Sequence, residues 1–238
     1  MKYLTFLTTL GLGLGSISTQ AEISADISAT TDYVWRGVSQ TLGNPALQGG
    51  INFNHASGAY AGLWMSNVNY FDPGTPGADP ADDNQANVEL DYNFGLACTG
   101  AEELSWDIGL YHYTYPGAVK ALLDSSDEYY AGAAYRWANV MLYRDFDSHA
   151  NYLQVGATAT LPHELSLSVG LGRYQLSDSP DYSDYRLALS GNTYGIGIEL
   201  GYSDTTMNKG RCLDFSGATN LCDGRLVLSL SKHFGKDD

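Results

Sequence analysis

The feature that most constrains the fold of this chain is a two-residue periodicity that starts near its N-terminus. In the segment SADISATTDYVWRG, apolar and aromatic side chains alternate with polar ones. Ile27, Tyr33 and Trp35 share one face, and Asp26 and Asp32 share the other. Because successive side chains of a strand point to opposite sides, the pattern predicts a β-strand with one apolar and one polar face. A soluble β-domain would bury the apolar face, whereas an outer-membrane barrel would turn it to lipid.

Alternating segments of about ten residues recur along the rest of the chain, separated by turn residues. The alternation is strict in 86–97 and 193–203, whereas the two faces of 59–70 do not separate. The number of predicted strands is even, as a bacterial barrel with both ends on one side requires. The twelve predicted strands span 22–36, 46–55, 59–70, 86–97, 103–115, 127–137, 139–146, 150–161, 164–175, 184–191, 193–203 and 224–234.

The connections between these strands alternate in length. Short connections span 55–58, 98–103, 137–139, 161–165 and 190–194. Long connections span 36–46, 70–86, 115–127, 145–151, 176–184 and 203–224, and all but the first contain several aspartates. Outer-membrane barrels have short periplasmic turns and long extracellular loops, and a sandwich has no reason to keep this order. The sequence therefore predicts an all-β fold, a transmembrane antiparallel β-barrel of about 12 strands with long acidic extracellular loops.

The N-terminal segment MKYLTFLTTLGLGLGSISTQA has one lysine, a short apolar run and then small residues. This composition predicts a secretory signal peptide over 1–21 and a mature barrel domain over 22–238. A transmembrane anchor is the alternative, but the run is short and rich in glycine. No later segment approaches ~18 consecutive apolar residues, so the mature chain can span a bilayer only as a closed barrel.

The charge balance limits the partners that the chain can bind. It has 12 lysines and arginines against 27 aspartates and glutamates, a formal charge of -15. Nucleic acids attract the opposite sign, so no nucleic-acid partner is expected. The 18 tyrosines and 27 glycines are typical of an outer-membrane barrel in contact with lipid and lipopolysaccharide, because tyrosine suits the headgroup level. A secreted carbohydrate-binding β-domain is another class that is rich in tyrosine.

The cysteines and histidines indicate structure rather than metal chemistry. Cys212 and Cys222 flank a short polar loop in an exported chain, which predicts a disulfide. Cys98 is then an unpaired thiol near a strand end. The histidines are scattered without metal-binding spacing, so no metal and no cofactor are expected. The carboxylates of loop 70–86 lack the spacing of a known calcium site, which favours a solvated loop.

No catalytic residues are predicted. The chain has no GxSxG, HExxH or P-loop pattern. Asp147, Ser148 and His149 are adjacent in a long loop, but adjacent residues of an extended chain point apart and do not form a triad. We therefore expect a protein that is not an enzyme.

The C-terminal segment RLVLSLSKHF predicts a last amphipathic strand. Leu226, Leu228, Leu230 and Phe234 share one face. Outer-membrane barrels commonly end in such a strand with a near-terminal aromatic residue, which the barrel-assembly machinery reads. Lys232 interrupts the apolar face and the chain continues past the aromatic residue, so an ordinary edge strand is the alternative.

Several stretches of the chain resemble one proteobacterial family. The resemblance is carried by DYVWRGVSQTLGNPALQGGINF, GAYAGLWMSNVNY, ELDYNFGL and YHYTYPG, and residues 32–48 are its most specific part. On these motifs the chain resembles the TorF family of porins, earlier catalogued as Gcw_chp-type proteins. The resemblance covers essentially the whole mature chain and implies an outer-membrane location and a pore. It brings no substrate and no catalytic residues.

The polar strand faces would line the barrel interior, and two functions fit such an interior. A narrow pore would pass small hydrophilic solutes, neutral or cationic because carboxylates are in excess. A closed barrel would act as a surface structural or adhesion protein through its acidic loops, since small barrels fill with side chains. Tyr33 and Trp35 are expected in the lipid-facing aromatic girdle, and no long loop is apolar enough to predict a plug. The predicted pore-lining residues are Asp26, Glu89, Asp91, Asp107, Arg136, Arg186 and Glu199.

Overall fold

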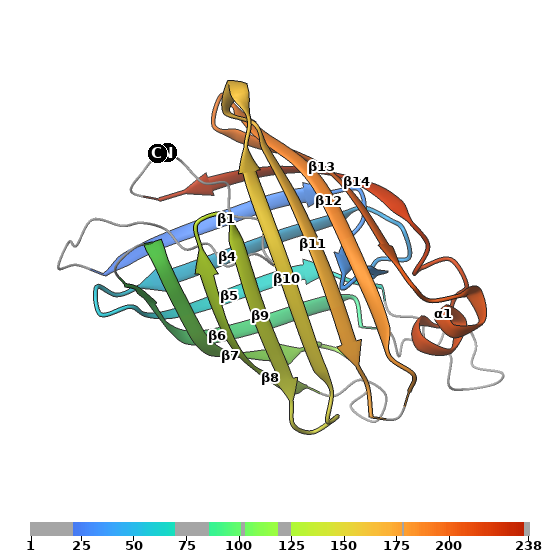
Figure 1. The fold of residues 1–238 in the computed structure, drawn as a ribbon. Helices are drawn as coiled ribbons and strands as arrows, with labels where there is room; N and C mark the ends of the chain where they lie inside the picture. Colours follow the sequence, from blue (N-terminus) through green and yellow to red (C-terminus); the bar gives the residue numbers. More distant parts are fainter. Residues whose placement is uncertain (1–20, 70–85, 101–102, 119–124, 178, 236–238) are drawn as a thin grey trace.

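Twelve strands of the computed structural model close into one antiparallel barrel (Figure 1), which confirms the predicted fold. The order around the barrel follows the chain from β4 to β14, and β1 pairs with both β4 and β14. The structure describes residues 21–69, 86–100, 103–118, 125–177 and 179–235; the predicted signal peptide and most of loop 70–86 lie outside this range. The barrel strands are β1 (Glu22–Thr30), β4 (Ala46–Asn54), β5 (Ala59–Asn67), β6 (Val88–Thr99), β7 (Leu104–Thr114), β8 (Ser126–Tyr135), β9 (Ala138–Asp145), β10 (Asn151–Thr160), β11 (Ser166–Gln175), β12 (Tyr182–Thr193), β13 (Ile196–Thr205) and β14 (Arg225–Phe234).

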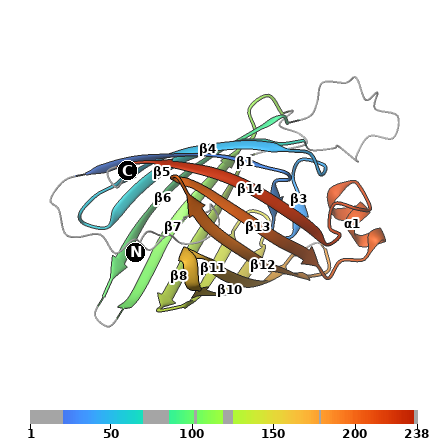
Figure 2. The same cartoon turned by 90° about the horizontal axis from the view of Figure 1, so that it is seen from above.

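The two ends of the barrel differ in their connections, as predicted. Short turns join β4 to β5, β6 to β7, β8 to β9 and β12 to β13, and a 3₁₀ helix (Pro162–Glu164) joins β10 to β11. The opposite end carries the long connections, among them helix α1 (Lys209–Ser216), which stands outside the barrel in Figure 2. This asymmetry makes the long-loop end extracellular. Within the described ranges, no helix is long and apolar enough to cross a membrane.

Strand β13 illustrates how the sequence period divides the wall into two faces. Ile198 and Leu200 are exposed on the outside, whereas Gly197, Glu199 and Gly201 are buried on the inside. The same alternation in the other strands gives the barrel an outer surface of leucine, isoleucine, valine and aromatic side chains. A soluble monomer does not expose a continuous apolar surface of this kind. The outer face therefore meets lipid, and the soluble alternative is excluded.

The first predicted strand ends earlier than its periodicity indicates. β1 stops at Thr30, and the chain then forms a hairpin of β2 (Val34–Trp35) and β3 (Val38–Ser39). Arg36 and Gly37 make its two-residue turn, with φ of 48° and 81°. A type I′ turn requires positive φ at both positions, and glycine accepts it without strain. Figure 2 places β3 at the end of the barrel that carries α1.

Tyr33 and Trp35 consequently do not lie in a lipid-facing girdle, and that prediction is corrected. Their rings pack against Trp64 and Tyr174, with centroids 5.4 Å and 6.0 Å apart, and both partners belong to the inner side of the barrel. Tyr33 and Trp35 continue the apolar face of β1 as far as the turn, so periodicity alone does not reveal the change of direction. The expectation that no long loop enters the barrel is corrected as well, because residues 31–45, here called the inserted segment, occupy its mouth.

The main cluster of buried apolar side chains lies at the extracellular end. Val38 of the inserted segment packs there against Leu221 and the disulfide formed by Cys212 and Cys222, whose Cα atoms are 5.8 Å apart. Cys98 is free and exposed. The barrel thus has a polar inner wall and a small conventional core at one end.

Candidate functional site

Four of the predicted pore-lining carboxylates are buried inside the barrel. The Asp107 carboxylate in β7 accepts a hydrogen bond of 2.8 Å from the Tyr60 hydroxyl in β5, so the contact passes over the intervening strand β6. Asp91 Oδ1 has no hydrogen-bond partner among the residues that the structure describes. Buried carboxylates with few partners are characteristic of a polar, hydrated lumen rather than of a packed core. The four residues are Glu89, Asp91, Asp107 and Glu199.

Two more of the predicted residues lie on the inner wall in cross-strand pairs. Arg186 in β12 forms an ion pair with Glu199 in β13. Asp26 in β1 is paired with His233 of β14 at 2.7 Å and accepts a hydrogen bond of 3.3 Å from the Asn52 amide. Asp26 and His233 are direct partners in the strand register, so the ladder itself brings them together.

Arg136 lies outside the lumen, and its predicted position is corrected. β8 ends at Tyr135, and Arg136 occupies the short turn that follows, with a φ of 54°. Its guanidinium is 3.4 Å from the Glu103 carboxylate, and the two side chains are 59% and 65% exposed. The alternating pattern of β8 extends one residue into the turn, where it no longer determines which way a side chain points.

A belt of tyrosine rings follows the inner wall through six neighbouring strands, β7 to β12. Successive ring centroids are 5.1 to 6.0 Å apart. Glycines give the rings room, since a Cβ at Gly109 would collide with Tyr130 and one at Gly172 would collide with Tyr152. This tyrosine belt consists of Tyr111, Tyr130, Tyr143, Tyr152, Tyr174 and Tyr182.

The turn of the inserted segment reaches across the lumen to the opposite wall. Arg36 Nη2 donates to both carboxylate oxygens of Glu128 in β8 at 2.7 Å, and the two side chains are only 5% and 6% exposed. The guanidinium also lies 4.1 Å from the ring centroids of Trp35 and Tyr152. Burial disfavours its charge, but the Glu128 carboxylate outweighs this and raises the pKa of Arg36 above its ordinary value. A fixed positive charge therefore sits inside an aromatic wall.

Further contacts hold the inserted segment in place. Asp32 accepts hydrogen bonds from Ser39 at 2.7 Å and Thr41 at 2.9 Å, and it pairs with Arg225 of β14 at 2.5 Å. The Ser39 amide donates to the Leu221 carbonyl at 2.9 Å, which ties the segment to the disulfide-closed region. The mouth of the barrel is therefore constricted by a structure that is bonded on several sides.

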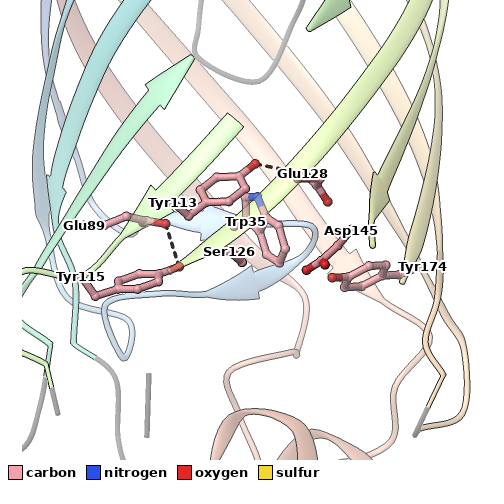
Figure 3. A pocket seen from close by; sticks show the side chains of 8 residues that line it. All are labelled: Trp35, Glu89, Tyr113, Tyr115, Ser126, Glu128, Asp145 and Tyr174. Atoms are coloured by element: carbon pink, nitrogen blue, oxygen red, sulfur yellow. Dashed lines mark hydrogen bonds between the residues drawn. The ribbon is translucent and has the colours of Figure 1, made fainter. Parts of the chain in front are cut away.

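A small cavity remains beside the inserted segment, and we call it the mouth pocket (Figure 3). Its volume is about 70 Å³. The Tyr115 hydroxyl donates to Glu89 Oε1 at 3.2 Å, and the Tyr113 hydroxyl donates to Glu128 Oε2 at 3.0 Å. Glu89 Oε2 has no hydrogen-bond partner in the described part of the chain, although Glu89 is only 3% exposed. The lining residues are Trp35, Glu89, Tyr113, Tyr115, Ser126, Glu128, Asp145 and Tyr174.

The sequence predicted Glu89 only as a pore-lining residue, and it did not assign Glu128 or Asp145 to a site. Glu128 lies in β8 and Asp145 ends β9, and both segments were predicted as strands. Their roles depend on the inserted segment, which supplies Trp35 and Arg36. The available signal was the Arg-Gly pair, since glycine in a two-residue connection marks a hairpin.

The metal-ligating side chains and the loop after β9 are two other places where the sequence could support chemistry. No group of three or more histidine, cysteine, aspartate or glutamate side chains is placed to hold a metal ion there. In the loop after β9, Asp145 accepts hydrogen bonds from the amides of Asp147 and Ser148 at 2.8 and 3.0 Å. His149 contacts the carbonyl of Asp147. These contacts are those of a turn.

Comparison with known proteins identifies the family. The family model described as "Bacterial protein of unknown function (Gcw_chp)" matches residues 16–234. The chain belongs to the Gcw_chp family. This agrees with the resemblance found in its motifs, and no curated protein sequence matches this Gcw_chp chain.

Solved structures similar to this Gcw_chp protein are outer-membrane barrels. The KdgM porin matches with a TM-score of 0.57 and 9% identity, covering 89% of this chain and 99% of its own. "KdgM porin in complex with disordered oligogalacturonate" matches with a TM-score of 0.52 and 8% identity, covering 90% and 99%. At these identities the likeness establishes the barrel fold alone.

Proposed function

We propose that the protein is a narrow outer-membrane channel for passive diffusion of small hydrophilic solutes, neutral or cationic. The observation that carries this proposal is the charge of the interior. Seven acidic side chains but only one basic side chain, Arg36, are buried among the described residues. Carboxylates in a water-filled passage attract cations and repel anions. The porin function implied by the TorF resemblance supports the same proposal.

The partners of the buried acids support a cation-attracting lumen. Three of them pair with arginines, in the pairs Arg36–Glu128, Arg225–Asp32 and Arg186–Glu199. Asp107 and Asp184 accept hydrogen bonds from tyrosine hydroxyls, which carry no compensating positive charge. Oligogalacturonate, named in one KdgM structure, is a polyanion. We propose the opposite solute preference for this chain.

The test is a single-channel recording. The mature chain, Glu22 to Asp238, is refolded and placed in a planar bilayer under a potassium chloride gradient. We expect stable current steps and a reversal potential whose sign indicates selectivity for cations. Because the inserted segment narrows the mouth, the steps should be small, and dextran-sized polymers should not enter. Anion selectivity would contradict the proposal.

A closed barrel with a surface role is the second candidate, and the anchoring of the inserted segment favours it. The Arg36–Glu128 pair and the hydrogen bonds of Asp32 hold the segment across the mouth. A folded, heat-modifiable barrel that passes no current would select this function. A cell-surface phenotype on replacing residues 209–222 by a short flexible linker, with the barrel still folded, would then support it.

Export and assembly complete the proposal. Residues 1–21 serve as the signal peptide, and the exposed apolar face of β14 is the segment that the barrel-assembly machinery reads. Leu226, Leu228, Leu230 and Phe234 are all exposed on that strand. Truncation before Phe234 should lower the amount of folded barrel in the outer membrane, whereas truncation after Gly235 should not.

A further inference from the structure

We propose that the mouth pocket binds a small organic cation of the alkylated ammonium type. The inference deepens the proposed channel function, on which its role in transport rests, by naming the solute class that the mouth selects. Binding itself needs only the pocket and would persist in a barrel that passes no current.

The unsatisfied carboxylate of Glu89 is the first argument. Two tyrosine hydroxyls, those of Tyr33 and Tyr115, donate to the Glu89 carboxylate, the second to Oε1 at 3.2 Å, yet its buried Oε2 has no hydrogen-bond partner in the described residues. Figure 3 places this carboxylate at the edge of the pocket, facing the space beside Trp35. A buried carboxylate oxygen without a partner is costly unless a counter-charge comes to it. A cationic ligand supplies that charge.

The net charge around the pocket is the second argument. Glu89, Glu128 and Asp145 line it, and Arg36 neutralises Glu128 through both carboxylate oxygens. Glu89 and Asp145 remain, and Asp91 follows one inward-facing position further along β6. Carboxylates therefore outnumber the arginine at the pocket, which favours a cation over an anion there.

The aromatic walls of the pocket are the third argument, because in this structure they already contact one organic cation, the Arg36 guanidinium. Arg36 lies 4.1 Å from the ring centroid of Trp35 and 4.8 Å from that of Tyr174, and both rings also line the pocket. Tyr113 and Tyr115 add two further rings on the side of Glu89. Tryptophan and tyrosine faces attract cations, and aromatic cages are the usual recognition site for quaternary ammonium groups.

The geometry favours an organic cation over a metal ion or potassium. The described carboxylates are not clustered closely enough to hold a metal. A small hydrated ion keeps its water and gains little from aromatic faces, whereas a weakly hydrated alkylammonium group gains from the rings and from Glu89 together. The cavity of about 70 Å³ accepts such a head group or several water molecules.

Calorimetry with choline tests the proposal. The mature protein in detergent micelles is titrated with choline chloride and, separately, with its uncharged isostere 3,3-dimethylbutan-1-ol, in buffer that holds the ionic strength constant with potassium chloride. Saturable binding of choline is expected, at least about tenfold tighter than that of the isostere. Equal binding of the two compounds would mean that the pocket is an apolar cavity only, and this result would overturn the proposal.

Two variants and two matched controls locate the site. Glu89→Gln keeps the shape of the side chain and removes its charge, and Trp35→Leu removes one aromatic wall; each should weaken choline binding about tenfold. Glu103→Gln and Trp137→Leu alter the same residue types on exposed turns, and they should change nothing. If Glu89→Gln binds choline as the unaltered protein does, the assignment fails, whatever Trp35→Leu does to the fold of the inserted segment.

Bilayer recordings separate the failure of this inference from the failure of the proposed function. Potassium current that choline does not block, together with no calorimetric binding, overturns the inference and leaves the channel. Calorimetric binding in a barrel that passes no potassium current overturns the channel and leaves the binding site. Choline block from the extracellular side, lost in Glu89→Gln, supports both.

Discussion

The barrel wall and the inserted segment are held by different kinds of interaction. Each wall strand is bonded along its length to two neighbours, in a register that also alternates apolar and polar faces. The inserted segment has a two-residue ladder and relies on contacts with residues far away in sequence, such as Glu128 and Arg225. Local pattern therefore determines the wall, whereas long-range charge and aromatic contacts determine the mouth. Substitutions should affect the two regions separately.

The largest effect is expected from Glu128→Ala, which should loosen the mouth and leave the wall intact. It leaves the Arg36 guanidinium buried without its counter-ion, a loss of about 3–5 kcal/mol. The segment can relieve this cost by leaving the lumen, so single-channel conductance should rise and the amides of residues 34–39 should exchange faster. Amides of the wall strands should exchange as before.

The exposed pair of Arg136 and Glu103 is the matched control for this change. Both side chains are more than half exposed, and breaking such a pair costs about 0–1 kcal/mol. Glu103→Ala should therefore alter neither conductance nor exchange. Unchanged exchange over 34–39 in Glu128→Ala would show that the buried pair does not hold the segment.

The wall should respond most to a charge on its lipid face. Leu187 lies at the middle of β12 and is exposed on the outside. Leu187→Arg should lower the free energy of unfolding in lipid vesicles by about 2–4 kcal/mol, the cost of arginine near the bilayer midplane. A urea titration measures this loss of free energy when the folded and unfolded barrels are quantified by their different gel mobilities.

Gln154→Arg is the corresponding change on the inner face of β10. Gln154 is half-buried beside Gly170 in the lumen, where water solvates a charge. The cost should be below about 1 kcal/mol, since lumen positions of such barrels tolerate charge. Equal losses for Leu187→Arg and Gln154→Arg would contradict the assignment of the two faces.

The disulfide should matter to the mouth alone. Replacing Cys212 and Cys222 by serine opens a short loop, which in the chain-entropy account lowers local stability by about 2–3 kcal/mol. Faster exchange is expected in α1 and the inserted segment, which packs on this region through Val38. The thermal unfolding of the wall should not change, and Cys98→Ser should have no effect on either region. Loss of the whole barrel would show that the two regions fold together.

The same division explains what the sequence could predict. All twelve wall strands were found, because a half-exposed strand has to alternate and the alternation is visible in residues such as Val88, Leu90 and Tyr92. Six of the seven predicted lumen residues lie on the inner wall for the same reason. The prediction for Arg136 was wrong because β8 ends at Tyr135, one residue before Arg136.

The mouth could not be predicted in this way. Tyr33 and Trp35 continue the alternation of β1, and only the Arg-Gly turn departs from it. The partners that fix the segment, Glu128 and Tyr152, lie on β8 and β10, far from it in the sequence. A periodicity says which residues share a face, but it does not say which distant faces meet. The family resemblance is most specific over residues 32–48, but it does not give the physical reason. That reason is the set of contacts that the inserted segment makes with Glu128 and Tyr152.

The smallest effect, and the most informative about transport, is expected from Asp91→Asn and Asp107→Asn. Neither carboxylate forms an ion pair among the described residues, so no basic side chain there offsets the charge that either one carries. In a hydrated passage one charge changes the energy of a passing ion by about 1 kcal/mol or less. Each substitution should therefore move the reversal potential under a potassium chloride gradient part of the way towards zero, and the double variant should move it further. Asparagine can still accept the Tyr60 hydrogen bond, so the geometry at residue 107 is preserved. If the reversal potential stays unchanged while Glu89→Gln shifts it, selection takes place at the mouth pocket rather than along the wall, and the inserted segment rather than the barrel determines what the channel admits.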